Sequence, residues 1–127
     1  MGAVALDDAG ALAAGSSTGG VFGKLPGRVG DAPVFGAGYH VSPAAAVVGT
    51  GVGEFFLETL ACHRTTELIT EGVDPQEACR RVILAIARPG ITAGLLAVDA
   101  EGRVGAAYRG GAWPVEDPDG PLEAESV

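Results

Sequence analysis

An arginine and an aspartate lie three residues apart in a glycine-rich segment, Gly27-Arg28-Val29-Gly30-Asp31. A guanidinium group binds a carboxylate through two parallel hydrogen bonds, and a carboxylate binds an ammonium group. Acting separately, Arg28 and Asp31 suit the α-carboxylate and the α-amine of an amino acid. The alternative is an ordinary ion pair between the two side chains, without a ligand.

A second glycine-rich motif, residues 49–54, reads Gly-Thr-Gly-Val-Gly-Glu between an apolar strand and a helix. Free N–H groups gather at a helix N-terminus, and glycine lets a ligand approach the backbone closely. Thr50 and Gly51 therefore predict an oxyanion hole, with the Thr50 hydroxyl and the Gly51 N–H as donors. Two alternatives stay open. Thr50 caps the helix, or the loop binds a dinucleotide, although its spacing is GxGxG rather than GxGxxG.

Three hydroxyl residues, Ser16, Ser17 and Thr18, precede two glycines at the expected end of a strand. Their hydroxyls suit a binding site or, equally, the backbone of a turn. The aromatic residues Tyr39, Tyr108 and Trp113 are expected in the core or at its rim rather than in a stacking surface.

The histidines and cysteines show none of the spacings of a metal centre or a catalytic triad. We expect structural or surface roles for His40 and His63, and buried free thiols for Cys62 and Cys79. No metal and no cofactor is expected.

The composition predicts one folded domain. The chain has 127 residues, 47% of them hydrophobic, and a net charge of −8, which disfavours a nucleic-acid partner. The segment 116–127 carries five acids and no base, so we expect a domain over 1–115 and an acidic, disordered or peripheral tail. No signal peptide or membrane-length apolar run is evident, which favours the cytoplasm and no membrane partner.

Hydrophobic periodicity and turn residues predict an α+β fold, with helices on one face of an antiparallel sheet. The other sheet face needs a cover that the chain alone does not supply. The expected elements are a hairpin (3–6 and 12–14), a loop (16–38), a strand pair (35–41 and 44–48), a helix (53–71), a helix capped by Asp74 with Glu77 in a capping box, and a hairpin (95–98 and 104–108).

Several motifs in this order resemble the β subunit of plant-type L-asparaginase / isoaspartyl peptidase. The resemblance runs from Gly2 to about Gly111, and the related glycosylasparaginases share much of it. The motifs are Gly2-Ala3-Val4-Ala5-Leu6-Asp7, Ser17-Thr18-Gly19-Gly20, Lys24-Leu25-Pro26-Gly27-Arg28-Val29-Gly30-Asp31, Gly36-Ala37-Gly38 and Thr50-Gly51-Val52-Gly53-Glu54.

The resemblance implies half of an αββα N-terminal-nucleophile sandwich, made when a precursor cleaves itself into α and β chains. A Thr at the start of the β chain then hydrolyses an amide through an acyl-enzyme, with its own α-amine as base. Thr18 would orient this nucleophile, and Thr50 and Gly51 would form the oxyanion hole. The substrate-binding residues would be Arg28 for the α-carboxylate, Asp31 for the α-amine, and Gly53.

One feature departs from the family pattern. The family β chain begins Thr-Val-Gly-Ala-Val, whereas this sequence begins Met1-Gly2-Ala3-Val4. Met1 aligns with the family's Val, so the Thr expected before Gly2, at the position that precedes this Val, is missing. The chain as written is expected to be inactive by itself and to need the α subunit of the same precursor in an (αβ)2 assembly. The expected substrates are L-asparagine and β-aspartyl (isoaspartyl) dipeptides. The alternatives are a non-catalytic amino-acid-binding or structural relative and a glycosylasparaginase-like amidase.

Overall fold

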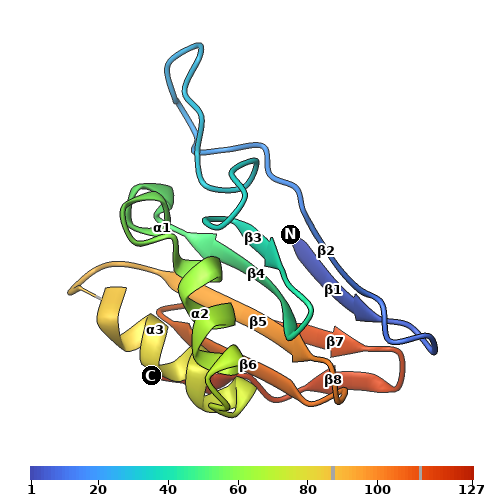
Figure 1. The fold of residues 1–127 in the computed structure, drawn as a ribbon. Coiled ribbons are helices and arrows are strands. Elements are labelled where there is room, and N and C mark those ends of the chain that lie inside the picture. The colour runs from blue at the N-terminus through green and yellow to red at the C-terminus, as the bar shows by residue number, and fades with distance from the viewer. Residues whose placement is uncertain (87, 112) are drawn as a thin grey trace.

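The computed structural model describes residues 1–86, 88–111 and 113–127. Three helices and nine strands are assigned in these residues (Figure 1). The helices are α1 (Gly53–Thr59), α2 (Ala61–Thr70) and α3 (Pro75–Ile86). The strands are β1 (Gly2–Leu6), β2 (Leu12–Ser16), β3 (Tyr39–Val41), β4 (Ala45–Gly51), β5 (Ala93–Asp99), β6 (Val104–Arg109), β7 (Val115–Asp117), β8 (Gly120–Leu122) and β9 (Glu125–Ser126).

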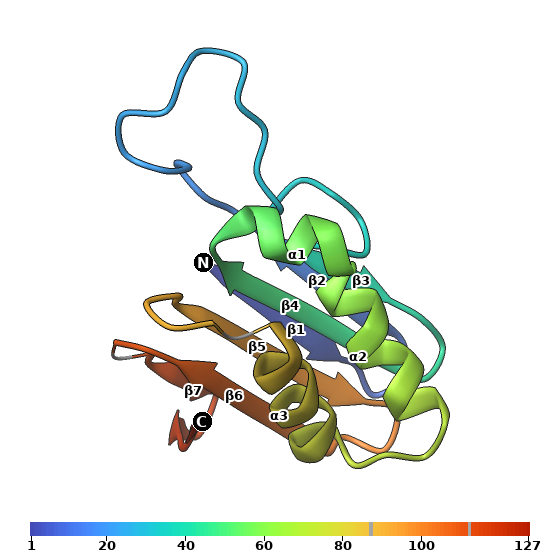
Figure 2. The same ribbon diagram turned by 90° about the vertical axis from the view of Figure 1, so that its left-hand side faces the viewer.

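A five-stranded sheet in the order β3-β4-β5-β6-β9 forms the centre of the molecule. The pairs from β3 to β6 are antiparallel, and only β9 joins β6 in parallel. Figure 2 shows α2 and α3 side by side on one face of this sheet, with β1 on the other. The predicted α+β class is confirmed.

Alternation along β4 explains the two layers beside the sheet. A Cβ on Gly49 would lie 2.5 Å from the Phe56 ring of α1, so this position faces the helices. Val48 points the other way and meets Gly2 of β1, where a Cβ would lie 2.9 Å from Val48 Cγ2. The β1–β2 hairpin therefore covers part of the second face of the sheet. The expectation that the chain itself supplies no cover for this face is wrong for the part that lies under the hairpin.

Both predicted hairpins form around the same turn chemistry. Asp7 Oδ1 accepts hydrogen bonds from the N–H groups of Ala9 and Ala11. Asp99 Oδ1 likewise accepts from the N–H groups of Glu101 and Arg103. An aspartate at the first turn position thus holds the backbone of each connection.

The helix expected over 53–71 is two helices, because Leu60 adopts a left-handed conformation with φ of 47°. The Leu60 N–H closes α1 on Phe56 O, and α2 starts afresh at Ala61. The His63 N–H then donates to Gly36 O at 2.9 Å, which ties α2 to the loop before β3. This tertiary contact leaves no pattern in the sequence.

The strand expected over 35–41 is also shorter, since only Tyr39–Val41 pairs with β4. Gly36, with φ of 91°, belongs to the turn that precedes it.

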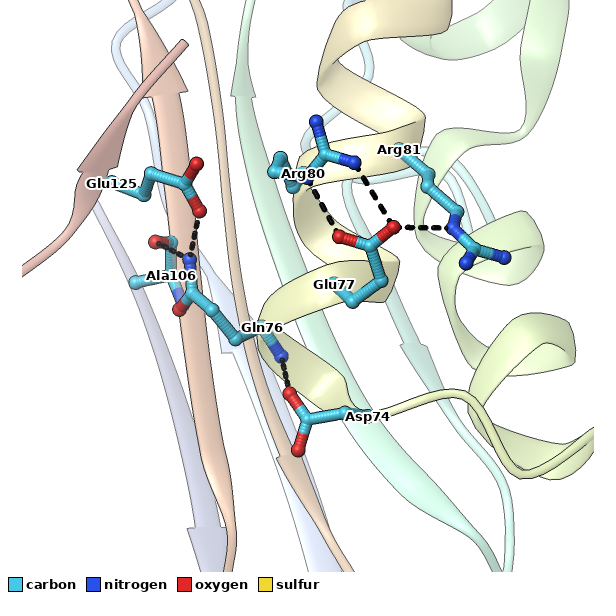
Figure 3. A network of polar contacts seen from close by, with 7 residues as sticks. All are labelled: Asp74, Gln76, Glu77, Arg80, Arg81, Ala106 and Glu125. Atoms are coloured by element: carbon cyan, nitrogen blue, oxygen red, sulfur yellow. Dashed lines mark hydrogen bonds and ion pairs between the residues drawn. The ribbon is translucent and has the colours of Figure 1, made fainter.

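The acidic segment 116–127 was expected to be disordered or peripheral. In the structure it contributes to the β7–β8 hairpin and to β9, and most of its residues are exposed. Figure 3 shows how β9 is held: Gln76 at the start of α3 exchanges hydrogen bonds with the backbone of Ala106 and donates to Glu125 Oε2 at 3.0 Å. The segment is therefore peripheral but structured.

The start of α3 follows the sequence prediction only in part. Asp74 Oδ1 accepts from the Gln76 N–H at 2.9 Å, as an N-cap does. Glu77 does not complete the capping box, because its carboxylate binds Arg80 and Arg81 instead (Figure 3).

Candidate functional site

Five of the six residues predicted for the site line one pocket of about 110 Å³, which we call the head-group pocket. They come from two parts of the fold: the loop between β2 and β3, and the end of β4. Met1 also lines it. The five are Thr18, Arg28, Asp31, Thr50 and Gly51.

The sixth residue, Gly53, supports the pocket from the first turn of α1. A Cβ at this position would lie 2.6 Å from Asp31 Oδ1 and 3.3 Å from Arg28 Nη2. Only glycine allows these two charged groups to come so near the start of the helix.

Backbone contacts fix the loop that carries Asp31. A Cβ on Gly38 would lie 2.5 Å from Asp31 O, so the two backbones touch directly. The Gly38 carbonyl in turn accepts a hydrogen bond from the Gly49 N–H at 2.9 Å. The Gly36-Ala37-Gly38 motif thus places Asp31 beside the end of β4.

Asp31 is a buried carboxyl group with 9% of its surface exposed. Burial raises its pKa above the ordinary value, although N–H groups of Asp31 and Ala32 and the charge of Arg28 oppose the rise. A buried carboxylate of this kind gains when a cationic ligand sits beside it.

Arg28 pairs with Glu54 rather than with Asp31 among the described residues: its Nη2 donates to Glu54 Oε1 at 3.0 Å. This contact lowers the pKa of Glu54. The side chain also passes over Gly30, where a Cβ would lie 2.6 Å from Nη1. The Arg28–Asp31 ion pair, one of the two alternatives from the sequence, is therefore not formed. Glu54 was not among the predicted site residues, although it directly follows the Thr-Gly-Val-Gly motif that contains three of them.

Thr50 and Gly51 end β4 and are exposed to the pocket side. A Cβ on Gly51 would lie 2.5 Å from the carbonyl oxygen of Thr92, the residue just before β5, so the backbones of Gly51 and Thr92 pack closely against each other. α1 begins with Val52 as its N-cap and without a side-chain capping bond, which rules out the alternative in which Thr50 caps the helix.

The Thr18 side chain bonds to the backbone of its turn, which is one of the two roles that the sequence suggested for these hydroxyls. Its Oγ1 accepts a hydrogen bond from the Gly20 N–H at 3.0 Å. It also lines the head-group pocket. Met1 lies opposite Ser17, with hydrogen bonds from the Met1 amine to Ser17 O (3.0 Å) and from Ser17 N–H to Met1 O (2.9 Å).

The histidines and cysteines lie outside the head-group pocket. His40 Nε2 and His63 Nδ1 are 3.3 Å apart, and His40 Nδ1 lies 3.2 Å from the Thr66 hydroxyl. Cys62 and Cys79 are buried free thiols as predicted, and burial raises the pKa of Cys79 to about 12. In the part of the chain that the structure describes, no three His, Cys, Asp or Glu side chains gather as a metal site. Among those same residues, no helix has the length and apolar character of a membrane span.

Comparisons with known proteins agree with the resemblance. An isoaspartyl peptidase of Salmonella typhimurium is 47% identical over 107 residues, covering 82% of this chain and 34% of that protein. A plant-type L-asparaginase of Pyrobaculum calidifontis is 44% identical over 112 residues, covering 85% and 37%. An N(4)-(beta-N-acetylglucosaminyl)-L-asparaginase of Mus musculus is 39% identical over 110 residues, covering 84% and 32%.

The chain spans about a third of the length of the curated relatives that it matches. A family model described as asparaginase matches residues 1–112. Because this match covers nearly the whole chain and the relatives agree with it, the chain belongs to the asparaginase family.

Proposed function

We propose that this chain provides the substrate-binding part of an amidohydrolase site that cleaves L-asparagine and β-aspartyl (isoaspartyl) peptides. The observation that supports it most is the grouping of Arg28, Asp31, Thr50 and Gly51 around one small pocket. The substrates named for the relatives share an aspartyl unit whose side-chain carbonyl forms an amide. Such a unit carries the α-carboxylate and α-amine that these charges complement.

Each charge then has a distinct role. Arg28 keeps several N–H donors beyond the one used by Glu54, so it binds the α-carboxylate of the substrate. Asp31 binds the α-ammonium group, whose charge offsets the cost of burying the carboxylate. Thr50 and Gly51 stabilise the negative charge that develops on the amide oxygen.

The strand register supports a position for the nucleophile. Gly2 pairs with Ser16 across β1 and β2, and Met1 exchanges hydrogen bonds with Ser17. A residue placed before Met1 in the same strand would face Thr18 in a non-hydrogen-bonded pair, where side chains come closest. A Thr at that position lies beside the head-group pocket, and the Thr18 hydroxyl orients it.

The reaction uses this Thr in two steps. Its oxygen bonds to the amide carbon while the C–N bond breaks, and its hydroxyl proton passes through the α-amine to the departing amine. Water then adds to the ester, the ester C–O bond breaks, and aspartate leaves as the threonine hydroxyl is restored. In this proposal the α subunit of the same precursor completes the sheet and forms an (αβ)2 assembly.

Calorimetric titration of the 127-residue chain with L-aspartate tests the binding half of the proposal. We expect saturable binding that Arg28→Ala abolishes, while Arg64→Ala, which removes an exposed arginine from α2, leaves it unchanged. Absence of binding to the folded wild-type chain contradicts the proposal.

The catalytic half needs the two-chain protein with Thr placed before Met1, assayed for aspartate release from L-asparagine and β-aspartyl dipeptides. A folded complex that binds aspartate but releases none from either substrate indicates a binding protein instead.

A further inference from the structure

Two histidines join β3 to α2 beside the segment that carries Asp31. His40 Nε2 and His63 Nδ1 lie 3.3 Å apart, and the ring centroids are 4.8 Å apart with the planes at 63°. At the outer ends of this pair, His40 Nδ1 lies 3.2 Å from Thr66 Oγ1, and His63 Nε2 lies 3.5 Å from Glu67 Oε1. Each ring nitrogen of the pair therefore faces a polar atom.

The contacts of Thr66 determine where the protons of the pair lie. The Thr66 hydroxyl has a single proton, which it donates to Cys62 O at 3.0 Å. Toward His40 the hydroxyl oxygen is then an acceptor, so His40 Nδ1 carries a proton. A neutral His40 has no proton on Nε2, and this nitrogen accepts a hydrogen bond from the Nδ1–H of His63.

Glu67 assigns the charge of the pair to His63. A carboxylate only accepts hydrogen bonds, so its contact with His63 Nε2 is favourable when this nitrogen is protonated. Because His63 Nδ1 also carries a proton, His63 is then the cation and His40 stays neutral. A second proton on the pair goes to His40 Nε2, where it sets two N–H groups and two positive charges against each other at 3.3 Å.

The surroundings of His40 oppose this second proton. Burial lowers the pKa of His40 below its ordinary value of 6.5, and the charge of His63 lowers it further, while Glu67 acts in the opposite direction. The strands that pack on β3 are β2 and β4, and neither contains a titratable residue. On α2, Arg64 is exposed, and burial raises the pKa of the Cys62 thiol, which stays neutral.

Both histidines also contact the turn that leads from Asp31 to β3. The His63 N–H donates to Gly36 O at 2.9 Å. The Phe35 ring packs on the His40 ring, with the centroids 4.5 Å apart. The two contacts hold this turn against α2 and β3, and Asp31 is its first residue.

We propose that His40 and His63 form a proton-dependent clamp that positions the segment carrying Asp31. The clamp is closed while the pair holds one positive charge, and it opens when His40 takes up a second proton. Both are positioning residues, since neither lines the head-group pocket. The effect of the clamp on ligand binding rests on the proposed function, in which Asp31 binds the ammonium group of an aspartyl unit.

NMR of the imidazole nitrogens in the 127-residue chain tests the clamp directly. We expect neutral His40 to carry its proton on Nδ1 and to become charged only below pH 6.5. As His40 becomes charged, the His63 N–H should lose about fivefold or more of its protection from hydrogen exchange, because its bond to Gly36 depends on the clamp. The Ala78 N–H, which donates to Asp74 O at the start of α3, serves as the control.

Two results of this titration overturn the proposal. One is a neutral His40 with its proton on Nε2. The other is protection of the His63 N–H that stays constant while His40 becomes charged.

Variants separate the clamp from general effects on the fold. His40→Gln offers an acceptor to His63 but cannot take up a charge, so it should remove the pH dependence of His63 protection. Thr66→Val removes the acceptor for His40 Nδ1, whereas Thr66→Ser keeps it. The proton on Nδ1 should therefore be retained in the Ser variant and lost in the Val variant. If a variant does not fold, the titration of the wild type decides by itself.

Calorimetric titration with L-aspartate at pH 7 and pH 5 measures the effect of the clamp on the head-group pocket. Protonation of Asp31 weakens binding in the wild type and in His40→Gln alike, so the two proteins are compared at each pH. From pH 7 to pH 5 the wild-type affinity should fall about fivefold further than that of the variant.

The outcomes distinguish the clamp from the proposed function. An equal fall in affinity in both proteins overturns the positioning role and leaves the head-group assignment standing. If the folded chain binds no aspartate at either pH, the proposed function fails, and the NMR titration still decides whether the clamp exists.

Discussion

Arg28 and Glu54, separated by 26 residues, meet beside the candidate site, where Arg28 Nη2 donates to Glu54 Oε1 at 3.0 Å. The bond joins the glycine-rich loop to the first turn of α1. Because Arg28 lowers the pKa of Glu54, the carboxylate keeps its charge into the acid range. The guanidinium is thus held in place before any ligand arrives.

Glu54→Gln tests this positioning role. We expect aspartate affinity to fall by no more than about fivefold, because the Glu54 side chain is 61% exposed and exposed ion pairs contribute little. Calorimetry measures the change, with Glu58→Gln on the same helix as the control. A loss as large as that of Arg28→Ala would show that Glu54 does more than orient its partner.

Asp31→Asn should stabilise the chain at neutral pH. Because burial raises the pKa of Asp31, the folded state holds the proton more tightly than the unfolded state does. Stability is therefore greatest below the unfolded pKa, and it declines as the pH rises through the raised folded pKa. Melting temperatures from pH 3 to 7 should show this decline in the wild type and a flatter profile in the variant.

The same substitution should abolish aspartate binding, since the neutral amide offers no charge to the ammonium group. For the same reason, wild-type affinity should weaken as the pH falls through the pKa of Asp31. A variant that melts lower than the wild type at pH 7, or that still binds aspartate, contradicts this account.

Gly53→Ala should impair binding more than folding. The added Cβ would lie 2.6 Å from Asp31 Oδ1, so the carboxylate must move away from its position in the pocket. We expect at least tenfold weaker aspartate binding and a stability loss of about 1–3 kcal/mol, as for other overpacked sites. Calorimetry and chemical denaturation measure the two effects.

Gly15→Ala is the matched control, because a Cβ there meets nothing within 4 Å. Unchanged affinity in Gly53→Ala would mean that Asp31 is not held against α1 in the way described.

The β1–β2 hairpin should be a site of association. It forms a two-stranded sheet, and its outward positions Ala3, Ala5 and Ala13 are exposed small residues. Strand edges without a partner and a small apolar face are typical of surfaces that another chain covers. We expect light scattering to show self-association of the chain alone, and a defined complex when the complementing chain is present.

Ala5→Lys should weaken this association, and Leu84→Lys on exposed α3 should not. A stable, monodisperse monomer of 12.6 kDa would contradict the expectation of a partner.

Local chemistry in the sequence determined most of the elements. Asp7 and Asp99 mark the two hairpin turns, and Asp74 marks the start of α3, because each acts on neighbouring backbone groups. The motifs around Arg28 and Thr50 likewise identified the candidate site and the family. Charge, glycine and hydroxyl types at fixed spacing carry that information without reference to the fold.

Contacts between distant segments decided the rest. The break at Leu60 accompanies the bond from His63 to Gly36, and β9 pairs with β6 while Gln76 of α3 donates to Glu125. The pairing of Arg28 with Glu54 and the packing of the Trp113 ring on Gly94 arise in the same way. Residues far apart in the chain meet only once the sheet has set their positions, so no local pattern records these contacts.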